Sequence, residues 1–391
     1  MIPLMKSTFL EEIETKKALS SFILSVERFS MGEQCQKFEK EFSEFQGMNQ
    51  AVLFNSGGSS NLAILQTLKN LGKLEADDKI AFSALTWSTN VMPIMQLGME
   101  PVPVDCEPTT LNSMSYQLKK RLDESDIKAF FITNALGFAG DLNAIRQICD
   151  ERSIILLEDN CEALGTELVD GKTGAFGDMA SFSFYVAHHL STIEGGMVCT
   201  NNDEYAEMLR IVRANGWDRN ISEKGQEKWR SKYNVNSTFN ANFTFYDLGY
   251  NLRPTEITGF LGRSQMKFLH ENIATREKNY RLLEKEVKKN PDLLSFDHSH
   301  ITKLSSFAFP VMCKTPEIRE RYLAKFIEAG VEVRPMIAGN MQNQPFYKKY
   351  ISQRYNLEGT DKIHNNGFYF GNYPELSDAD LQTIGKCLKK F

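Results

Sequence analysis

Two adjacent histidines, His188 and His189, are well suited by residue type to proton transfer. An imidazole with its ordinary pKa of about 6.5 can accept and release a proton near neutral pH. A pair of histidines can equally be structural or resemble a metal site by accident. No acid or cysteine is spaced around this pair to complete a metal site, so we expect no bound metal here.

A glycine-rich turn covers residues 55–62, directly after an apolar run and at the start of a helical pattern. Gly57 and Gly58 allow the backbone to approach an anion, and the start of the helix, with Ser59, offers unpaired N–H groups. The turn could therefore bind a phosphate. A plain turn after a strand can have the same composition.

Two further side chains follow predicted strands. Asp159 comes after the apolar run 154–157 and Trp87 after the run 79–82. A carboxylate at the carboxyl end of a strand points into the crevice where open α/β sheets bind ligands, although it could instead cap the next helix. The tryptophan could stack on a flat ligand or simply be buried.

Short apolar runs separated by helix-length segments must position these side chains. The runs are continuous rather than alternating, as expected for strands covered on both faces. Their regular spacing predicts an α/β fold with a mostly parallel sheet. The predicted strands are 51–54, 79–82, 101–104, 129–132 and 154–157, and an amphipathic helix is expected near 9–28.

After Pro254 the regular alternation of short apolar runs with helix-length segments ends. A long charged helical stretch, 270–289, leads to a predicted strand at 307–312, a helix at 316–328 and a last helix that begins at Ser377 with a capping pattern. We expect a large domain in residues 1–265 and a smaller α+β domain in residues 266–391.

The bulk properties narrow the class of protein. The net charge of −5 over 391 residues argues against non-specific nucleic-acid binding. No apolar run approaches the roughly 18 residues of a membrane span, and the N-terminus lacks the apolar core of a signal peptide. The seven cysteines form no C-x-x-C pair, which is typical of reduced, buried thiols. We therefore expect a cytoplasmic protein.

Ser183 precedes His188 by five residues, and the segment 158–165 lies upstream at a characteristic distance. Both segments resemble the DegT/DnrJ/EryC1/StrS family of nucleotide-sugar aminotransferases, and the similarity extends over nearly the whole chain. Most members have a lysine where this chain has His188. A subgroup with histidine there removes a hydroxyl group from keto sugars instead of adding an amine.

The resemblance implies a fold-type I enzyme with a seven-stranded large-domain sheet. Pyridoxal 5′-phosphate, or its amine form pyridoxamine 5′-phosphate, would be held without a covalent anchor, and His188 would be the base. Gly57, Gly58, Ser59 and Ser183 would bind the cofactor phosphate. Asp159 would contact the ring nitrogen, Trp87 the ring face, and Glu162 the phenolic oxygen, where aminotransferases usually have glutamine or histidine.

Two further residues take their expected roles from the same resemblance. Asn251 would reach the phosphate of a neighbouring subunit, which implies a homodimer with shared active sites. Arg219 would lie near the sugar, unless it forms a surface salt bridge. Some relatives carry an iron–sulfur cluster, but residues 215–251 contain no cysteine, and a cluster needs several thiolates.

The activity that the resemblance implies is removal of the C3 hydroxyl group from a nucleotide-linked 4-keto-6-deoxy sugar. The expected substrate is GDP-linked 4-keto-6-deoxymannose, with glutamate as amino donor. Two alternatives remain open. One is an aminotransferase-like enzyme that forms an amino sugar, and the other is a non-catalytic protein that has kept the fold.

Overall fold

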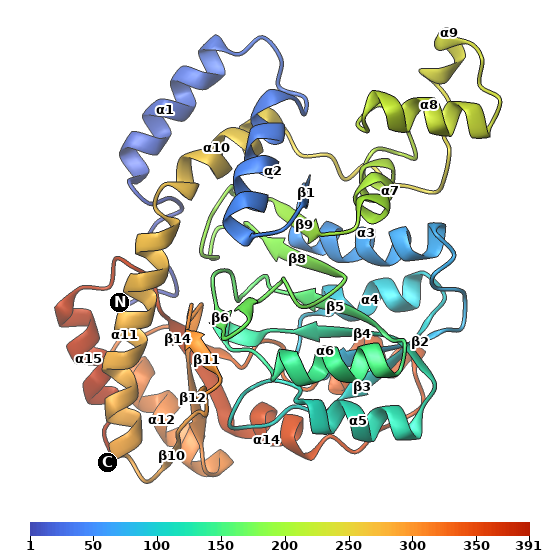
Figure 1. The fold of residues 1–391 in the computed structure, drawn as a ribbon. Coiled ribbons are helices and arrows are strands. Elements are labelled where there is room, and N and C mark those ends of the chain that lie inside the picture. The colour runs from blue at the N-terminus through green and yellow to red at the C-terminus, as the bar shows by residue number, and fades with distance from the viewer.

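The structure, a computed structural model, describes residues 1–391. Its centre is a seven-stranded sheet with the order β1-β9-β8-β5-β4-β2-β3 (Figure 1). Neighbouring strands from β8 through β5, β4 and β2 to β3 are parallel, and β9 alone runs against its neighbours β1 and β8. The strands are β1 Gln50–Phe54, β2 Lys79–Ser83, β3 Glu100–Val104, β4 Ile127–Thr133, β5 Ile155–Asp159, β8 Met179–Ser183 and β9 Gly196–Thr200.

All five strands predicted from the apolar runs are confirmed, each within two residues at either end. Their residues are buried almost without interruption, which explains why the runs are continuous. The segments that form β8 and β9 contain fewer consecutive apolar residues than the other strands, so the sequence did not predict them as strands. The mostly parallel α/β architecture expected from the sequence is the one observed.

Helices cover both faces of this sheet. Alternate strand residues, such as Phe131 and Phe130, belong to different buried clusters because successive side chains point to opposite faces. One cluster includes α3, α4 and α7, and the other includes α5, α6 and the small domain. The helices are α3 Gly57–Asn70, α4 Ser88–Gln96, α5 Ser115–Glu124, α6 Leu142–Glu151 and α7 Asp203–Arg213, with a 3-10 turn at Ala135–Gly137.

Three helices form a layer beside β1 and β9. They are α1 Glu12–Ser25, α2 Glu33–Gln46 and α10 Glu256–Met266 (Figure 1). The helix predicted near 9–28 is present as α1. The ring of Phe22 stacks on Phe260 with centroids 4.4 Å apart, and the hydroxyl of Thr15 accepts the amide of Gln265 at 3.1 Å, while Leu24 is 86% exposed. Its apolar pattern is therefore only partly used within this chain.

The small domain follows the long helix α11, Leu269–Lys289. Its antiparallel sheet has the order β10-β12-β14-β13. The helix predicted at 316–328 is confirmed as α12, and Ser377 caps the last helix as predicted. The strands are β10 Leu293–Leu294, β12 Ala308–Cys313, β13 Val333–Pro335 and β14 Gly367–Gly371; the helices are α12 Pro316–Glu328, α13 Pro345–Tyr350, α14 Glu358–Asn366 and α15 Asp378–Leu388, with a 3-10 turn at Met341–Asn343.

The start of the chain packs against this small sheet. Ile2 forms a parallel bridge with Val331, and the backbone N–H of Leu4 donates to Glu332. A third, three-stranded sheet joins β6 Glu167–Leu168 and β7 Gly171–Lys172 to β11 Ile301–Lys303. A division of the chain near residue 266 remains our proposal, with the first residues lying on the small domain.

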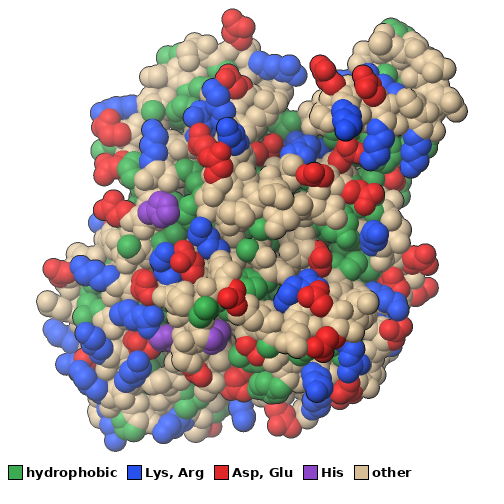
Figure 2. All heavy atoms as spheres, viewed as in Figure 1, with side chains coloured by type: hydrophobic (Ala, Val, Ile, Leu, Met, Phe, Trp, Pro, Cys, Tyr) green, Lys and Arg blue, Asp and Glu red, His purple; other side chains and the backbone are tan.

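An arm, residues 217–248, extends from α7 and contains the short helices α8 Glu223–Lys232 and α9 Thr238–Ala241. Figure 2 shows that the arm stands clear of the body, with a recess between it and the layer of α1 and α2. The arm presents several exposed apolar side chains: Phe239, Phe243, Phe245 and Leu248.

Two other expectations concern burial and hydropathy. Six of the seven cysteines are buried and Cys161 is partly buried, in agreement with the sequence. None of the helices combines the length and the apolar character that crossing a bilayer requires.

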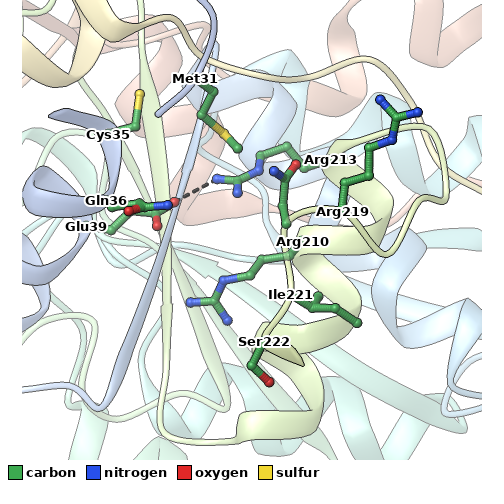
Figure 3. A pocket seen from close by; sticks show the side chains of 10 residues that line it. Met31, Cys35, Gln36, Glu39, Arg210, Arg213, Arg219, Ile221 and Ser222 are labelled. Atoms are coloured by element: carbon green, nitrogen blue, oxygen red, sulfur yellow. Dashed lines mark hydrogen bonds and ion pairs between the residues drawn. The ribbon is translucent and has the colours of Figure 1, made fainter. Parts of the chain in front are cut away.

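A buried ion pair ties α2 to β1 and α7. Arg213, whose side chain is 2% exposed, donates to Glu39 and to the carbonyl oxygen of Leu53, at 2.7 Å in each case (Figure 3). Glu39 in turn accepts the backbone N–H of Leu53 at 2.8 Å. The pair thus fixes the strand that leads into the glycine-rich turn.

We expect Glu39→Ala to lower the free energy of unfolding by about 3–5 kcal/mol, because it leaves a buried guanidinium without its counter-charge. Urea titration monitored by circular dichroism measures this. Glu41→Ala is the matched control, since Glu41 on the same helix pairs with the half-exposed Arg263 and should cost about 0–1 kcal/mol. Equal losses in the two variants would contradict the assignment.

Candidate active site

The turn between β1 and α3 is shaped to receive an anion. Ser56 caps α3, and its hydroxyl oxygen accepts the backbone N–H of Ser59 at 3.0 Å. A Cβ atom at Gly57 would lie 2.7 Å from the Cβ of Ser183 and 3.2 Å from the sulfur of Cys161. Position 57 therefore requires glycine, and the N-terminus of a fourteen-residue helix lies beside the serine that ends β8.

Asp159 is the last residue of β5 and is only 4% exposed. One carboxylate oxygen accepts the backbone N–H of Cys161 at 2.9 Å and the other accepts the amide of Asn61 at 3.1 Å. The side chain thus holds the turn that follows β5; no helix begins there, so the alternative of a helix cap is wrong. No lysine or arginine pairs with it, so a buried negative charge is left that a cationic ligand group would neutralise.

Trp87 precedes α4 and is 57% exposed. Simple burial, the competing explanation for this tryptophan, is therefore wrong. Its neighbour Thr89 lies against the glycine-rich turn, with its methyl group 3.0 Å from where a Cβ at Gly58 would be. An indole with an open face near the turn can cover a flat ring.

Glu162 lies in the turn after β5. Its carboxylate accepts the backbone N–H of Leu136, a residue in the left-handed region with φ of 55°, at 2.9 Å. Burial raises the pKa of Glu162 to about 7, and the charge of Asp159 adds to this rise. The group can therefore hold a proton near neutral pH and donate it to a ligand oxygen.

His188 lies in the loop after β8, five residues beyond Ser183. Its Nδ1 is 3.3 Å from the carbonyl oxygen of Ser183, and its ring contacts Phe307 edge-on with centroids 5.2 Å apart. Because a carbonyl can only accept, Nδ1 carries the proton and Nε2 keeps a free lone pair. Burial lowers the pKa of His188 to about 4, although the Ser183 carbonyl and Asp159 oppose the shift.

His189 has a different environment. It is 3% exposed, and its Nε2 donates to the carbonyl oxygen of Ser305 at 3.0 Å. Its own carbonyl accepts the amide of Asn272 from α11 at 2.5 Å. These two contacts fix the loop through His189. The ring of His188 instead lies beside Ser183.

The cluster fits pyridoxal phosphate. The glycine-rich turn and Ser183 can receive its phosphate, the unpaired Asp159 suits a protonated ring nitrogen, and Trp87 can cover the ring. No lysine occurs between Ser183 and Thr200, so no amine of this loop can anchor the group covalently.

Two residues predicted to belong to the site lie outside the cluster around His188. Asn251 forms an isolated β-bridge with Ala214, and Arg219 stacks on Trp217 with its Cζ 4.1 Å from the ring centroid. Both line a second cavity that has no lining residue in common with the cluster around His188. Arg219 pairs with no carboxylate, so the alternative of a surface salt bridge is wrong.

Sequence reasoning missed three residues of the cluster: Asn61, Cys161 and Phe307. Asn61 could have been found, because it lies four residues after Gly57 and therefore one helical turn along the same face. Cys161 could have been found from its place two residues after Asp159. Phe307 is brought from the small-domain side by folding, and no local pattern predicts it.

Comparison with known proteins agrees with this geometry. The model of the DegT/DnrJ/EryC1/StrS aminotransferase family matches residues 11–389. GDP-4-keto-6-deoxy-D-mannose 3-dehydratase of Yersinia pseudotuberculosis is 32% identical over 372 residues, 94% of each protein.

Two solved structures are also similar. The Escherichia coli GDP-4-keto-6-deoxy-D-mannose-3-dehydratase with bound hydrated PLP has a TM-score of 0.90 and 31% identity, covering 100% of this chain and 99% of that one. A GDP-4-keto-6-deoxymannose-3-dehydratase with a trapped PLP-glutamate geminal diamine has a TM-score of 0.89 and 31% identity, with both chains fully covered. This chain belongs to the DegT/DnrJ/EryC1/StrS aminotransferase family.

Proposed function

We propose that this protein is a lysine-less, pyridoxal-phosphate-dependent 3-dehydratase of a nucleotide-linked 4-keto-6-deoxy sugar. The observation that carries the proposal is the neutral imidazole of His188 at the position of the missing lysine, next to Ser183 and Asp159. GDP-4-keto-6-deoxymannose is the proposed substrate and glutamate the amino donor, supported by the names of the similar proteins. The product would enter deoxysugar biosynthesis, such as that of lipopolysaccharide O-antigens.

The chain's own residues would hold the cofactor at both of its ends. Gly57, Gly58, Ser59 and Ser183 would bind the phosphate, and Asp159, Trp87 and Glu162 would hold the ring. Pyridoxamine phosphate, when bound, supplies an amine that condenses with a ketone and a ring that accepts an electron pair. Asp159 would keep the ring nitrogen protonated because its charge is otherwise unpaired.

His188 would move the proton. Its Nε2 lone pair is free because Nδ1 donates to the Ser183 carbonyl. Nε2 would accept a proton that bound pyridoxamine phosphate releases. Because burial disfavours the imidazolium, His188 would then give this proton to the departing C3 hydroxyl group, which leaves as water. Glu162, when protonated, would donate to the phenolic oxygen and thereby fix the ring in its plane.

The missing lysine also favours elimination over amination. No side-chain amine of this loop can compete for the cofactor, so the bound sugar stays at the site long enough to lose its hydroxyl group. The final products would be a 3-deoxy sugar, ammonia and 2-oxoglutarate, the oxidised form of the glutamate that supplies the electron pair. An amino group retained at C4 would instead indicate the aminotransferase alternative.

We further propose a homodimer with shared sites. Asn251 lines a cavity that shares no lining residue with the cluster around His188, and its carboxamide oxygen accepts the Nε–H of Arg253 at 3.0 Å. Its amide nitrogen would complete the phosphate site of a second copy.

We expect His188→Asn to reduce formation of the 3-deoxy product by about 100- to 10,000-fold, because asparagine cannot accept the proton. Sugar products and released ammonia are quantified together after incubation with pyridoxal phosphate, glutamate and the GDP-linked keto sugar. His188→Lys should permit a borohydride-trapped adduct that mass spectrometry detects. The control is His270→Asn, since His270 is exposed on α11. Turnover at the wild-type rate in His188→Asn would mean that the base lies elsewhere.

The ring protons of His188 should titrate near pH 4 in the cofactor-free protein, instead of at the ordinary value of about 6.5. The unfolded chain would take up this proton first, so the site's contribution to stability is complete above about pH 6.5 and is lost as the pH falls toward 4. NMR titration of histidine-labelled protein, with His188→Asn used for assignment, measures the pKa. A midpoint above 6 would contradict the proposed desolvation.

A heterodimer that combines one His188→Asn subunit with one Asn251→Ala subunit should regain about half of the wild-type activity, because one of its two shared sites carries neither substitution. Two affinity tags isolate the heterodimer from co-expressed subunits. Each homodimeric variant should be nearly inactive. If Asn251 acts within its own subunit, every site of the heterodimer is damaged and no activity returns.

A further inference from the structure

One amide side chain lies where three parts of the proposed cofactor site meet. Asn61 is on α3, four residues after Gly57 and therefore one helical turn along the helix whose start is shaped to receive an anion. The residue is fully buried, and its Nδ2 lies 3.1 Å from a carboxylate oxygen of Asp159 and 3.4 Å from the hydroxyl oxygen of Thr89. Asn61 thus joins the glycine-rich turn, the end of β5 and the start of α4, which Trp87 precedes.

The orientation of this amide follows from the group that it faces. A carboxylate only accepts hydrogen bonds, so the nitrogen of Asn61 must point to Asp159, since the reverse placement would bring two oxygen atoms together. Asp159 then has one donor on each oxygen, the backbone N–H of Cys161 at 2.9 Å and the amide of Asn61 at 3.1 Å. With both oxygens held, the plane of the carboxylate is fixed in the crevice.

The other end of the Asn61 amide has no partner. Its carbonyl oxygen accepts no hydrogen bond, although the residue is 0% exposed. A buried acceptor that stays unpaired lowers stability, and an apolar side chain of similar size, such as leucine, would avoid this cost. Packing therefore does not explain an asparagine at this position, whereas a role toward Asp159 does.

The lack of charge on this donor matters as much as its place. A lysine or arginine at position 61 would neutralise Asp159 and leave no charge for a cationic ligand group. The amide stabilises the ionised carboxylate and leaves its net charge unpaired. A carboxylate stabilised in this way attracts a proton less strongly, so a proton shared with a ring nitrogen stays on the nitrogen.

We propose that Asn61 is a positioning residue that acts through Asp159 and keeps the shared proton on the ring nitrogen of pyridoxal phosphate. The inference rests on the proposed contact of Asp159 with this nitrogen. A ring that carries this proton accepts an electron pair more readily than a neutral ring does. Asn61 thereby supports the reaction only through the carboxylate that it holds.

Nitrogen NMR tests this on protein loaded with pyridoxal phosphate that is isotope-labelled at its ring nitrogen, and it needs no turnover. The resonance differs between a protonated and a neutral pyridine nitrogen, so it reports where the proton lies. We expect the protonated form in the wild type and a shift toward the neutral form in Asn61→Leu, because the carboxylate loses a donor and attracts the proton more strongly. Asn61→Met, which fills the same space with a flexible apolar chain, should give the same shift.

Gln66→Leu is the matched control, because it removes another buried amide from the same helix. Gln66 is 3% exposed, donates to Asn70 at 2.7 Å and accepts the hydroxyl of Tyr250 at 2.8 Å, and it has no contact with Asp159. Its replacement should leave the ring-nitrogen resonance unchanged. The melting temperatures of the two Asn61 variants should fall no further than that of the control.

The outcomes separate this role from the proposed reaction. A wild-type resonance in a folded Asn61 variant, or an equal shift in Gln66→Leu, would overturn the inference and leave the dehydratase proposal intact. Failure of both Asn61 variants to fold would also overturn it, because the asparagine would then be required by the fold itself. The expected shift, together with a wild-type enzyme that forms no 3-deoxy sugar, would support the inference and refute the reaction.

Discussion

The active-site crevice depends on one buried carboxylate that does no chemistry itself. Glu158 is fully buried and accepts the backbone N–H groups of Gly174, Phe176 and Gly177 at 2.7, 2.9 and 2.7 Å, together with the amide of Asn134 at 3.2 Å. Burial raises the pKa of Glu158, and the three backbone donors oppose that rise. The contacts fix the chain between β5 and β8. Because adjacent strand residues point to opposite faces, they also aim Asp159 into the crevice.

The replacement of lysine by histidine changes what the surrounding protein must supply. A lysine would hold the cofactor by a covalent bond, whereas His188 can only exchange a proton with it. Under the proposed function, retention of the cofactor would depend on non-covalent contacts at both of its ends, at the start of α3 and at Asp159. As the proposed base, His188 must also stay neutral, and burial beside Phe307 favours the neutral form. His189, tied to Ser305 and Asn272, holds the loop so that the free nitrogen of His188 keeps its direction.

The predictable parts of this site are those specified by short stretches of sequence. The strands that lead to the glycine-rich turn, to Trp87 and to Asp159 are unbroken apolar runs, and the cap at Ser377 follows from local hydrogen bonding. The strand β8, which leads to Ser183 and His188, has no such run and was not predicted. The choice of His188 over His189 rests on a family spacing and stays a prediction, while the structure shows that the two rings differ in burial and in hydrogen-bond partners. Phe307 could not be predicted, because tertiary folding alone brings it to the loop. The same is true of Arg219, whose aromatic neighbours Trp217 and Phe243 are separated from each other by the whole of α8 and α9.

The surroundings of His188 limit how much positive charge the proposed site can hold. Asp159 would serve the ring nitrogen only while no side-chain cation neutralises it, and a nearby guanidinium would form an ion pair with it. Burial lowers the pKa of His188, and the like charge of Arg276 adds to this fall, since a like charge disfavours the charged form. Arg28, Arg219 and Arg253 line a different cavity, so they add no further positive charge beside the imidazole and do not neutralise Asp159.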